Sequence, residues 1–239
     1  AASATDALAA LPEDNAEEGE FGRTDQRLSA QHIDAYYRVA DAVAQEATSR
    51  REQLGVCPGS AIEQVCLRDY ATELLRQAYR HEPSTAEIDH ALEGTDSFSG
   101  AEKVHALVFT TLMAPDFLFK FENRGAVQDG IVTLTAYELA SRLSFHFWQS
   151  PPDEALLAAA AAGELETDAG YQAQVDRLFA DPKTDATILA FFEEWLHVQR
   201  GPFAESPRLS ILRDDIDTNG LAQEMQPEIE DLLAYHLGQ

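Results

Sequence analysis

The sequence predicts an all-α protein, an orthogonal multi-helix bundle of about eight or nine helices that form two packed helical subdomains. Apolar residues recur with the helical period of about 3.6 residues through most of the chain. A Ser or Thr with a Glu three positions later precedes two of these segments, and this pattern is the capping box of a helix start. Alternation with a period of two is nearly absent, and residues 130–134 are the one candidate strand.

Acidic residues dominate the charge of the chain. The 239 residues include 42 acidic and 17 basic side chains, which gives a formal net charge of −25 at pH 7, whereas the hydrophobic content of 45% is ordinary for a globular protein. This charge argues against nucleic-acid binding and against binding to anionic membrane surfaces, because both need a basic face. The apolar runs are too short to cross a bilayer, so membrane insertion is not expected.

The N-terminal part is predicted to contain an acidic lead-in and a helical domain. Residues 1–25 hold seven acidic residues and one basic residue, so we expect them to be extended. Residues 26–125 form the first helical domain. Its helices are expected from Ser29, over 61–81, from Ser84 to about 94, and over 100–113 with a break at Pro115.

A second helical domain is predicted over residues 131–239. Its helices are expected from Thr135 to Trp148, over 153–162, from Thr167, from Pro182 to before Gly201, and over 218–236. Gly163 follows the second of these helices and is expected to be its left-handed cap. Arg142 and Asp153 flank the Pro-Pro stop between the first two helices, and we expect them to form an ion pair across it.

The only two cysteines, Cys57 and Cys66, lie nine positions apart with a Pro-Gly-Ser turn between them. A disulfide would close a short loop at the entry to a helix and would indicate an oxidising, extracytoplasmic compartment. Two reduced, partly buried thiols are the alternative. The first residues lack the basic and apolar segments of a signal peptide, so the chain is expected to be a processed product or a fragment of a longer protein.

The sequence Glu-x-x-His occurs three times, against about 0.7 occurrences expected by chance. The pairs are Glu87 with His90, Glu102 with His105, and Glu194 with His197. Residues three apart share a helix face, and such pairs hold two irons in ferritin-like bundles, where facing glutamates complete the site. Glu138 is the candidate for such a glutamate. A di-iron site is therefore one hypothesis, and ordinary solvated or structural side chains are the alternative.

His146 lies between two phenylalanines on a helix that is apolar nearly all round, in the sequence RLSFHFW. An axial ligand to a cofactor is one interpretation, and a core histidine bonded to a carbonyl is the other, which we favour. Motifs for covalent haem attachment, phosphate binding, a nucleophile elbow and a zinc protease are missing from the chain.

Residues 137–165 and 174–198 carry a specific motif: Arg-Leu-Ser-aromatic, then Trp, Ser and Pro-Asp, then an Asp-Pro segment and a Trp-Leu helix end. They resemble helical domains of unknown function found in large secreted planctomycete and myxobacterial proteins, where they are cytochrome-associated. With the upstream part, the resemblance covers two consecutive domains over about residues 60–236. The matching residues are Arg142, Leu143, Ser144, Phe145, Trp148, Ser150, Pro152, Asp153, Asp181, Pro182, Trp195 and Leu196.

The resemblance implies an extracytoplasmic protein linked to c-type haem, because family members usually continue into domains with a haem-attachment motif. His146 stands where the family usually has Phe, and His197 lies outside the shared pattern. Because the sequence contains no Cys-x-x-Cys-His motif, we expect no haem covalently bound in this chain. We expect it to pack against a haem-bearing part, either the remainder of a parent protein or another chain. The competing hypotheses are a non-catalytic extracellular scaffold or binding module and the di-iron bundle.

Overall fold

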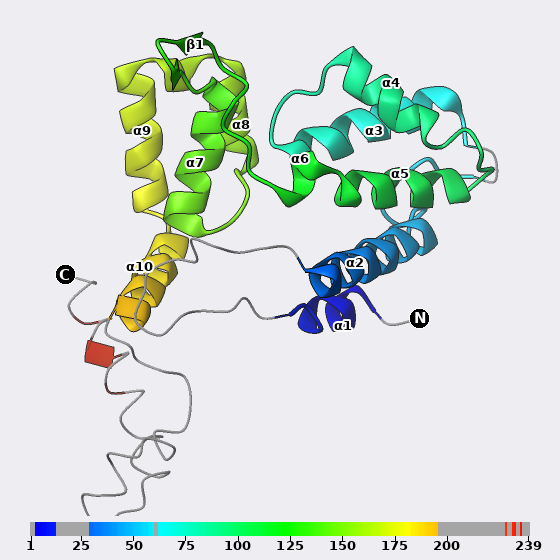
Figure 1. The fold of residues 1–239 in the computed structure, drawn as a ribbon, viewed down its shortest axis with the longest axis horizontal. Coiled ribbons are helices and arrows are strands. Elements are labelled where there is room, and N and C mark those ends of the chain that lie inside the picture. The colour runs from blue at the N-terminus through cyan, green and yellow to red at the C-terminus, as the bar shows by residue number, and fades with distance from the viewer. Residues whose placement is uncertain are drawn as a thin grey trace, which may run out of the picture.

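The structure, a computed structural model, describes residues 3–12, 29–59 and 62–195, together with Glu228, Asp231, Leu232 and Tyr235. Within these ranges the chain forms ten α-helices, one short 3-10 helix and a single two-stranded hairpin (Figure 1). The all-α, multi-helix prediction is confirmed. The helix expected over 218–236 lies outside the described ranges apart from the four isolated residues.

Six helices build the N-terminal unit: α1 (Ala4–Ala9), α2 (Ala30–Ser49), α3 (Gln64–Tyr79), α4 (Thr85–Glu93), α5 (Glu102–Met113) and α6 (Pro115–Leu118). The second helix, α2, packs along α5, and α3 packs on both α4 and α5. Their shared core centres on leucines with no exposed surface, namely Leu67, Leu75 and Leu107. The apolar stripes predicted from the sequence therefore meet in one hydrophobic cluster, which stabilises this unit.

The C-terminal unit contains a hairpin, four α-helices and the 3-10 helix η1. The elements are β1 (Val127–Gln128), β2 (Ile131–Val132), α7 (Ala136–Trp148), α8 (Glu154–Ala161), η1 (Glu164–Glu166), α9 (Asp168–Phe179) and α10 (Pro182–Trp195). A second hydrophobic cluster includes Leu143 and Trp148 from α7, Leu156 from α8 and Leu178 from α9. In Figure 1 these helices gather on the left and α2 to α6 on the right.

The helix starts follow the sequence closely. Ser84 and Thr135 accept hydrogen bonds from the backbone N–H of Glu87 and Glu138, whose carboxylates bond back to the two caps. The chain leaves α5 at Ala114, and Pro115 opens the short helix α6. These predicted caps and the predicted break are confirmed, since they depend on residues only a few positions apart.

Two local predictions differ from the structure. Part of the acidic lead-in is helical: α1 has a capping box between Ser3 and Asp6 and packs on α2. The candidate strand is two residues long and pairs with β1, so that Val127 opposes Val132 in an antiparallel hairpin. Gly125 lies at its base, where a Cβ would sit 1.6 Å from the carbonyl oxygen of Thr133, so glycine is required there. The predicted domain boundaries stay predictions.

The expected ion pair between Arg142 and Asp153 is wrong. Arg142 donates to Glu122, with Nε 3.1 Å from Oε1. Asp153 accepts the N–H of Leu156 as the N-cap of α8, and its carboxylate binds Arg177 of α9 at 2.8 and 3.0 Å. Proximity in sequence does not decide ion pairing here, because the two side chains leave the turn toward different elements.

In the part of the chain that the structure describes, no helix is long and apolar enough to cross a membrane.

Candidate functional site

A polar site lies where the end of α3 meets α6 and the linker, residues 119–126, which leads to the hairpin and α7. We name Arg80, His81, Glu87, Asp116 and Arg124 the junction cluster. Four of these, all but Glu87, line a cavity of about 30 Å³, together with aromatic side chains and residues of α7. The site therefore joins the two helical units, which have separate hydrophobic clusters.

Arg80 anchors the cluster. It ends α3 in the left-handed conformation, with φ of 62°, and only 8% of the residue is exposed. Its guanidinium donates to the carbonyl oxygens of Asp116 at 2.6 Å, Phe119 at 2.9 Å and Phe117 at 3.3 Å. It also reaches the carbonyl of Ala78 at 3.2 Å. Burial lowers the pKa of Arg80. This side chain thus satisfies backbone carbonyls that would otherwise lack partners at the end of α6.

Arg124 connects the linker to both units. Its guanidinium binds the carboxylates of Asp116 and, at 3.5 Å, Glu87 in the N-terminal unit. Its backbone N–H donates to Oε1 of Glu138 at 2.8 Å, at the start of α7. One residue of the linker therefore contacts α4, α6 and α7 at once.

Glu138, a predicted metal ligand, is a buried residue of the capping box that begins α7. The residue is 5% exposed, and Oε2 accepts both the N–H of Thr135 at 2.8 Å and its hydroxyl at 2.9 Å. Burial raises the pKa of Glu138, but hydrogen bonds lower it by more. They come from the backbone N–H groups of Arg124, Thr135 and Asn123 and from the Thr135 hydroxyl. The carboxylate is charged and both its oxygens are engaged in holding the start of α7 and the linker.

Tyr79, the last residue of α3, also lines the cavity. Burial, followed by the carboxylates of Asp116 and Glu87, raises the pKa of Tyr79 to about 12. The phenol therefore stays protonated at neutral pH.

Of the other predicted metal ligands, the structure describes the side chains of Glu102 and His105, and these contact different partners. Glu102 is exposed and accepts from Ser99 at 3.4 Å, while Nε2 of His105 lies 3.1 Å from Asp41. Glu194 belongs to α10, but its side chain lies outside the description, as does His197 altogether. Among the described residues no three His, Cys, Asp or Glu side chains converge as metal ligands would. A di-iron site stays an untested hypothesis.

His146 is exposed in the last turn of α7, and its ring meets the edge of Phe147 with centroids 5.0 Å apart. The favoured prediction of a core histidine is therefore wrong. Trp148 is the buried aromatic residue of this helix instead; its indole N–H donates to the carbonyl of Leu178 at 3.2 Å. Lys183 lies over the same ring, 4.4 Å from its centroid.

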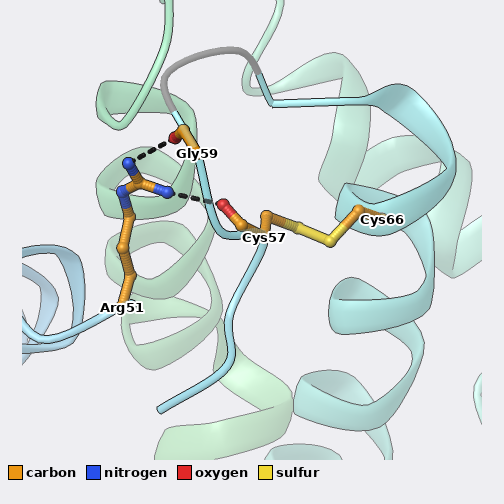
Figure 2. The surroundings of a disulfide bond; sticks show 4 residues. All are labelled: Arg51, Cys57, Gly59 and Cys66. Atoms are coloured by element: carbon orange, nitrogen blue, oxygen red, sulfur yellow. Dashed lines mark hydrogen bonds between the residues drawn. A yellow bond between two sulfur atoms is a disulfide. The ribbon is translucent and has the colours of Figure 1, made fainter. Parts of the chain in front are cut away.

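Cys57 and Cys66 form a disulfide, with Cα atoms 5.5 Å apart (Figure 2). Cys57 is buried, and Arg51 donates to its carbonyl oxygen at 2.5 Å and to that of Gly59 at 2.6 Å. Figure 2 shows that the guanidinium and the disulfide hold the loop from opposite sides. Residues 57–59 are thus held by a covalent bond and by the guanidinium of Arg51.

Sequence reasoning missed Arg80 and His81 as site residues. A signal was present: two basic residues follow the last apolar position of a helix and precede Pro83. Basic side chains at a helix end are favourable, because the helix dipole is negative there. The sequence pattern does not show that the linker lies next to these two residues in the fold.

Comparison with known proteins adds one match. No curated protein and no solved structure matches the chain. Residues 134–239 match the family model described as PSD4, protein of unknown function (DUF1592), so the chain resembles this family from α7 onward, where the RLSFHFW motif lies.

Proposed function

We propose that the chain is an extracytoplasmic helical module of a c-type-haem-linked oxidoreductase or electron-transfer protein, in which it packs against the haem-bearing part. The Cys57–Cys66 disulfide is the observation that carries this proposal, since structural disulfides persist in oxidising compartments. The haem link is supported by the sequence resemblance described above.

The residues of the resembling motif support a structural role for this module. Arg142 binds Glu122 of the linker, Trp148 fills the core, and Asp153 caps α8 while it binds Arg177. These three motif residues therefore secure the fold of the C-terminal unit rather than forming a reactive group. A module of this kind would act through its surface.

Exposed aromatic side chains supply apolar surface for such packing. Phe117, Phe119 and Phe121, around the junction of the two units, are 37%, 42% and 41% exposed. Aromatic residues are enriched at protein interfaces, because they bury a large area at a small entropic cost.

An absorption spectrum of the full-length parent protein, purified with its natural partners, tests the haem link. We expect a Soret band that co-elutes with this chain, and a preparation without that band would refute the link. The compartment has a separate test, namely alkylation of the native protein followed by mass spectrometry before and after reduction. Two free thiols before reduction would contradict the proposed location.

A non-catalytic extracellular scaffold is the second candidate. It is favoured by the junction cluster, whose carboxylates and guanidinium groups are engaged with one another or with the backbone. It predicts that the chain folds alone, without haem or metal. Circular dichroism of the isolated chain with elemental analysis distinguishes the two candidates, since a haem-dependent module would gain stability from its partner.

A further inference from the structure

His81 is the buried histidine of the described ranges, with 9% of the residue exposed. It follows Arg80 at the end of α3 and lines the junction cavity. Its Nδ1 lies 2.9 Å from the carbonyl oxygen of Glu82. A carbonyl oxygen can only accept, so Nδ1 carries the hydrogen of this bond, and in the neutral ring Nε2 is left with a lone pair.

The lone pair of Nε2 has no donor among the described residues. The atom is buried without a hydrogen bond, and the nearest ionisable oxygen is Oε1 of Glu87, 3.5 Å away. In the neutral ring these two atoms are both acceptors, which leaves a buried polar atom unsatisfied. Protonation changes the pair, because Nε2–H becomes a donor and the carboxylate stays an acceptor.

Charged groups from the neighbouring elements surround this ring. The carboxylate of Glu87 on α4 lies 3.5 Å from Nε2, and Asp116 on α6, Arg80 at the end of α3 and Arg124 on the linker line the same cavity as His81. The remaining titratable groups that line the cavity are Tyr79, Lys120, Tyr137 and Glu138. Of these groups, Glu87 is the one within ion-pairing distance of Nε2.

We propose that His81 is a proton-operated contact of the junction, which binds Glu87 as an ion pair when the ring is protonated and releases it when the ring is neutral. The pair stabilises the connection between α3 and α4 under mildly acidic conditions and is lost as the pH rises. Glu87 also binds Arg124, so the change reaches the linker between the units. Burial raises the pKa of Glu87, but the hydrogen bonds from Ser84 and the nearby side chains of His81 and Arg124 lower it by more. The pKa therefore lies below its usual value, and the carboxylate is charged throughout.

A double-mutant cycle on the full chain tests this contact. The variants are His81→Gln, Glu87→Gln and the double variant, and the measurement is urea unfolding at about pH 5 and about pH 8, on either side of the range in which histidines change charge. Glutamine at position 87 can still complete the capping box, so the helix start is preserved. We expect the His81–Glu87 coupling to change the unfolding equilibrium constant about tenfold at the lower pH and less than about twofold at the higher pH.

The matched control is His90 with Glu93, a pair at 3.9 Å whose side chains are 89% and 74% exposed. Its cycle, with His90→Gln and Glu93→Gln, should give less than about twofold coupling at both pH values. Equal coupling of His81 and Glu87 at the two pH values would overturn the proposal. Where His81→Gln fails to fold, NMR of the unmodified chain decides: the Glu87 carboxyl carbon must shift with the same midpoint as the His81 ring, and separate midpoints overturn the proposal.

Discussion

Replacement of Arg80 by methionine should be among the most destabilising single changes at the surface between the two units. Methionine keeps the length of the side chain and any strain of the left-handed backbone, so the change isolates the guanidinium. Four carbonyl oxygens accept from Arg80, three of them in or just after α6. A net hydrogen bond to a charged group contributes about 1.5–3 kcal/mol, and the bonds of one guanidinium are not additive. Because one buried and three part-buried carbonyls also lose their donor, we expect a loss of about 3 kcal/mol.

Urea unfolding followed by circular dichroism and tryptophan fluorescence measures this loss. The control is Arg38→Met, which removes an exposed guanidinium paired with Asp34 on α2, with side chains 70% and 59% exposed. A pair of this kind contributes about 0.3–0.5 kcal/mol. A loss for Arg80→Met below about 1 kcal/mol, close to that of the control, would refute the view that this cation holds α6 and the linker.

Three further outcomes follow from the structure. Replacement of Cys57 and Cys66 by alanine opens a loop with a sequence separation of nine and should cost about 2.5 kcal/mol of unfolding free energy, measured in urea; an unchanged midpoint would contradict a stabilising disulfide. Leu107→Ala removes a fully buried side chain and should cost about 3 kcal/mol by the same assay, whereas a loss under about 1 kcal/mol would show that this core is loosely packed. The lowered pKa of Glu138 contributes stability that is present above the ordinary carboxyl value of 4.5 and is lost as the pH falls through the folded value. Glu138→Gln should therefore flatten the decline of thermal stability between about pH 5 and pH 3, and Glu102→Gln should leave it unchanged.

Local signals in the sequence predicted most helix starts and stops. Four of these signals depend on contacts within four or five residues, so they can be recognised in the sequence. They are the capping boxes at Ser84 and Thr135, the break at Pro115 and the left-handed Gly163. The helix α1 was not predicted, because the acidic composition of residues 1–25 indicated an extended segment although Ser3 begins a capping box. Composition reports the average of a segment, whereas a helix start depends on a few positions.

Contacts between distant elements account for the errors in the site. The partner of Arg142 is Glu122 rather than Asp153, because the linker returns along α7. His146 points to solvent, although its neighbours in sequence are apolar, since only one side of α7 faces the core. The surroundings of His81 arise from α3, α4, α6 and the linker together, and no spacing in the sequence joins these segments.

The presence of two hydrophobic clusters has a consequence for cooperativity. The clusters share no residue, and ion pairs such as Arg76–Glu154, 2.6 Å apart, join the units across the junction. Polar contacts exchange readily with water, so each cluster can lose its structure while the other persists. Amide hydrogen exchange should then divide the described helices into two groups, α2 to α5 and α7 to α9, each with its own opening free energy. A partner that binds across the junction would merge the two groups into a single cooperative unit.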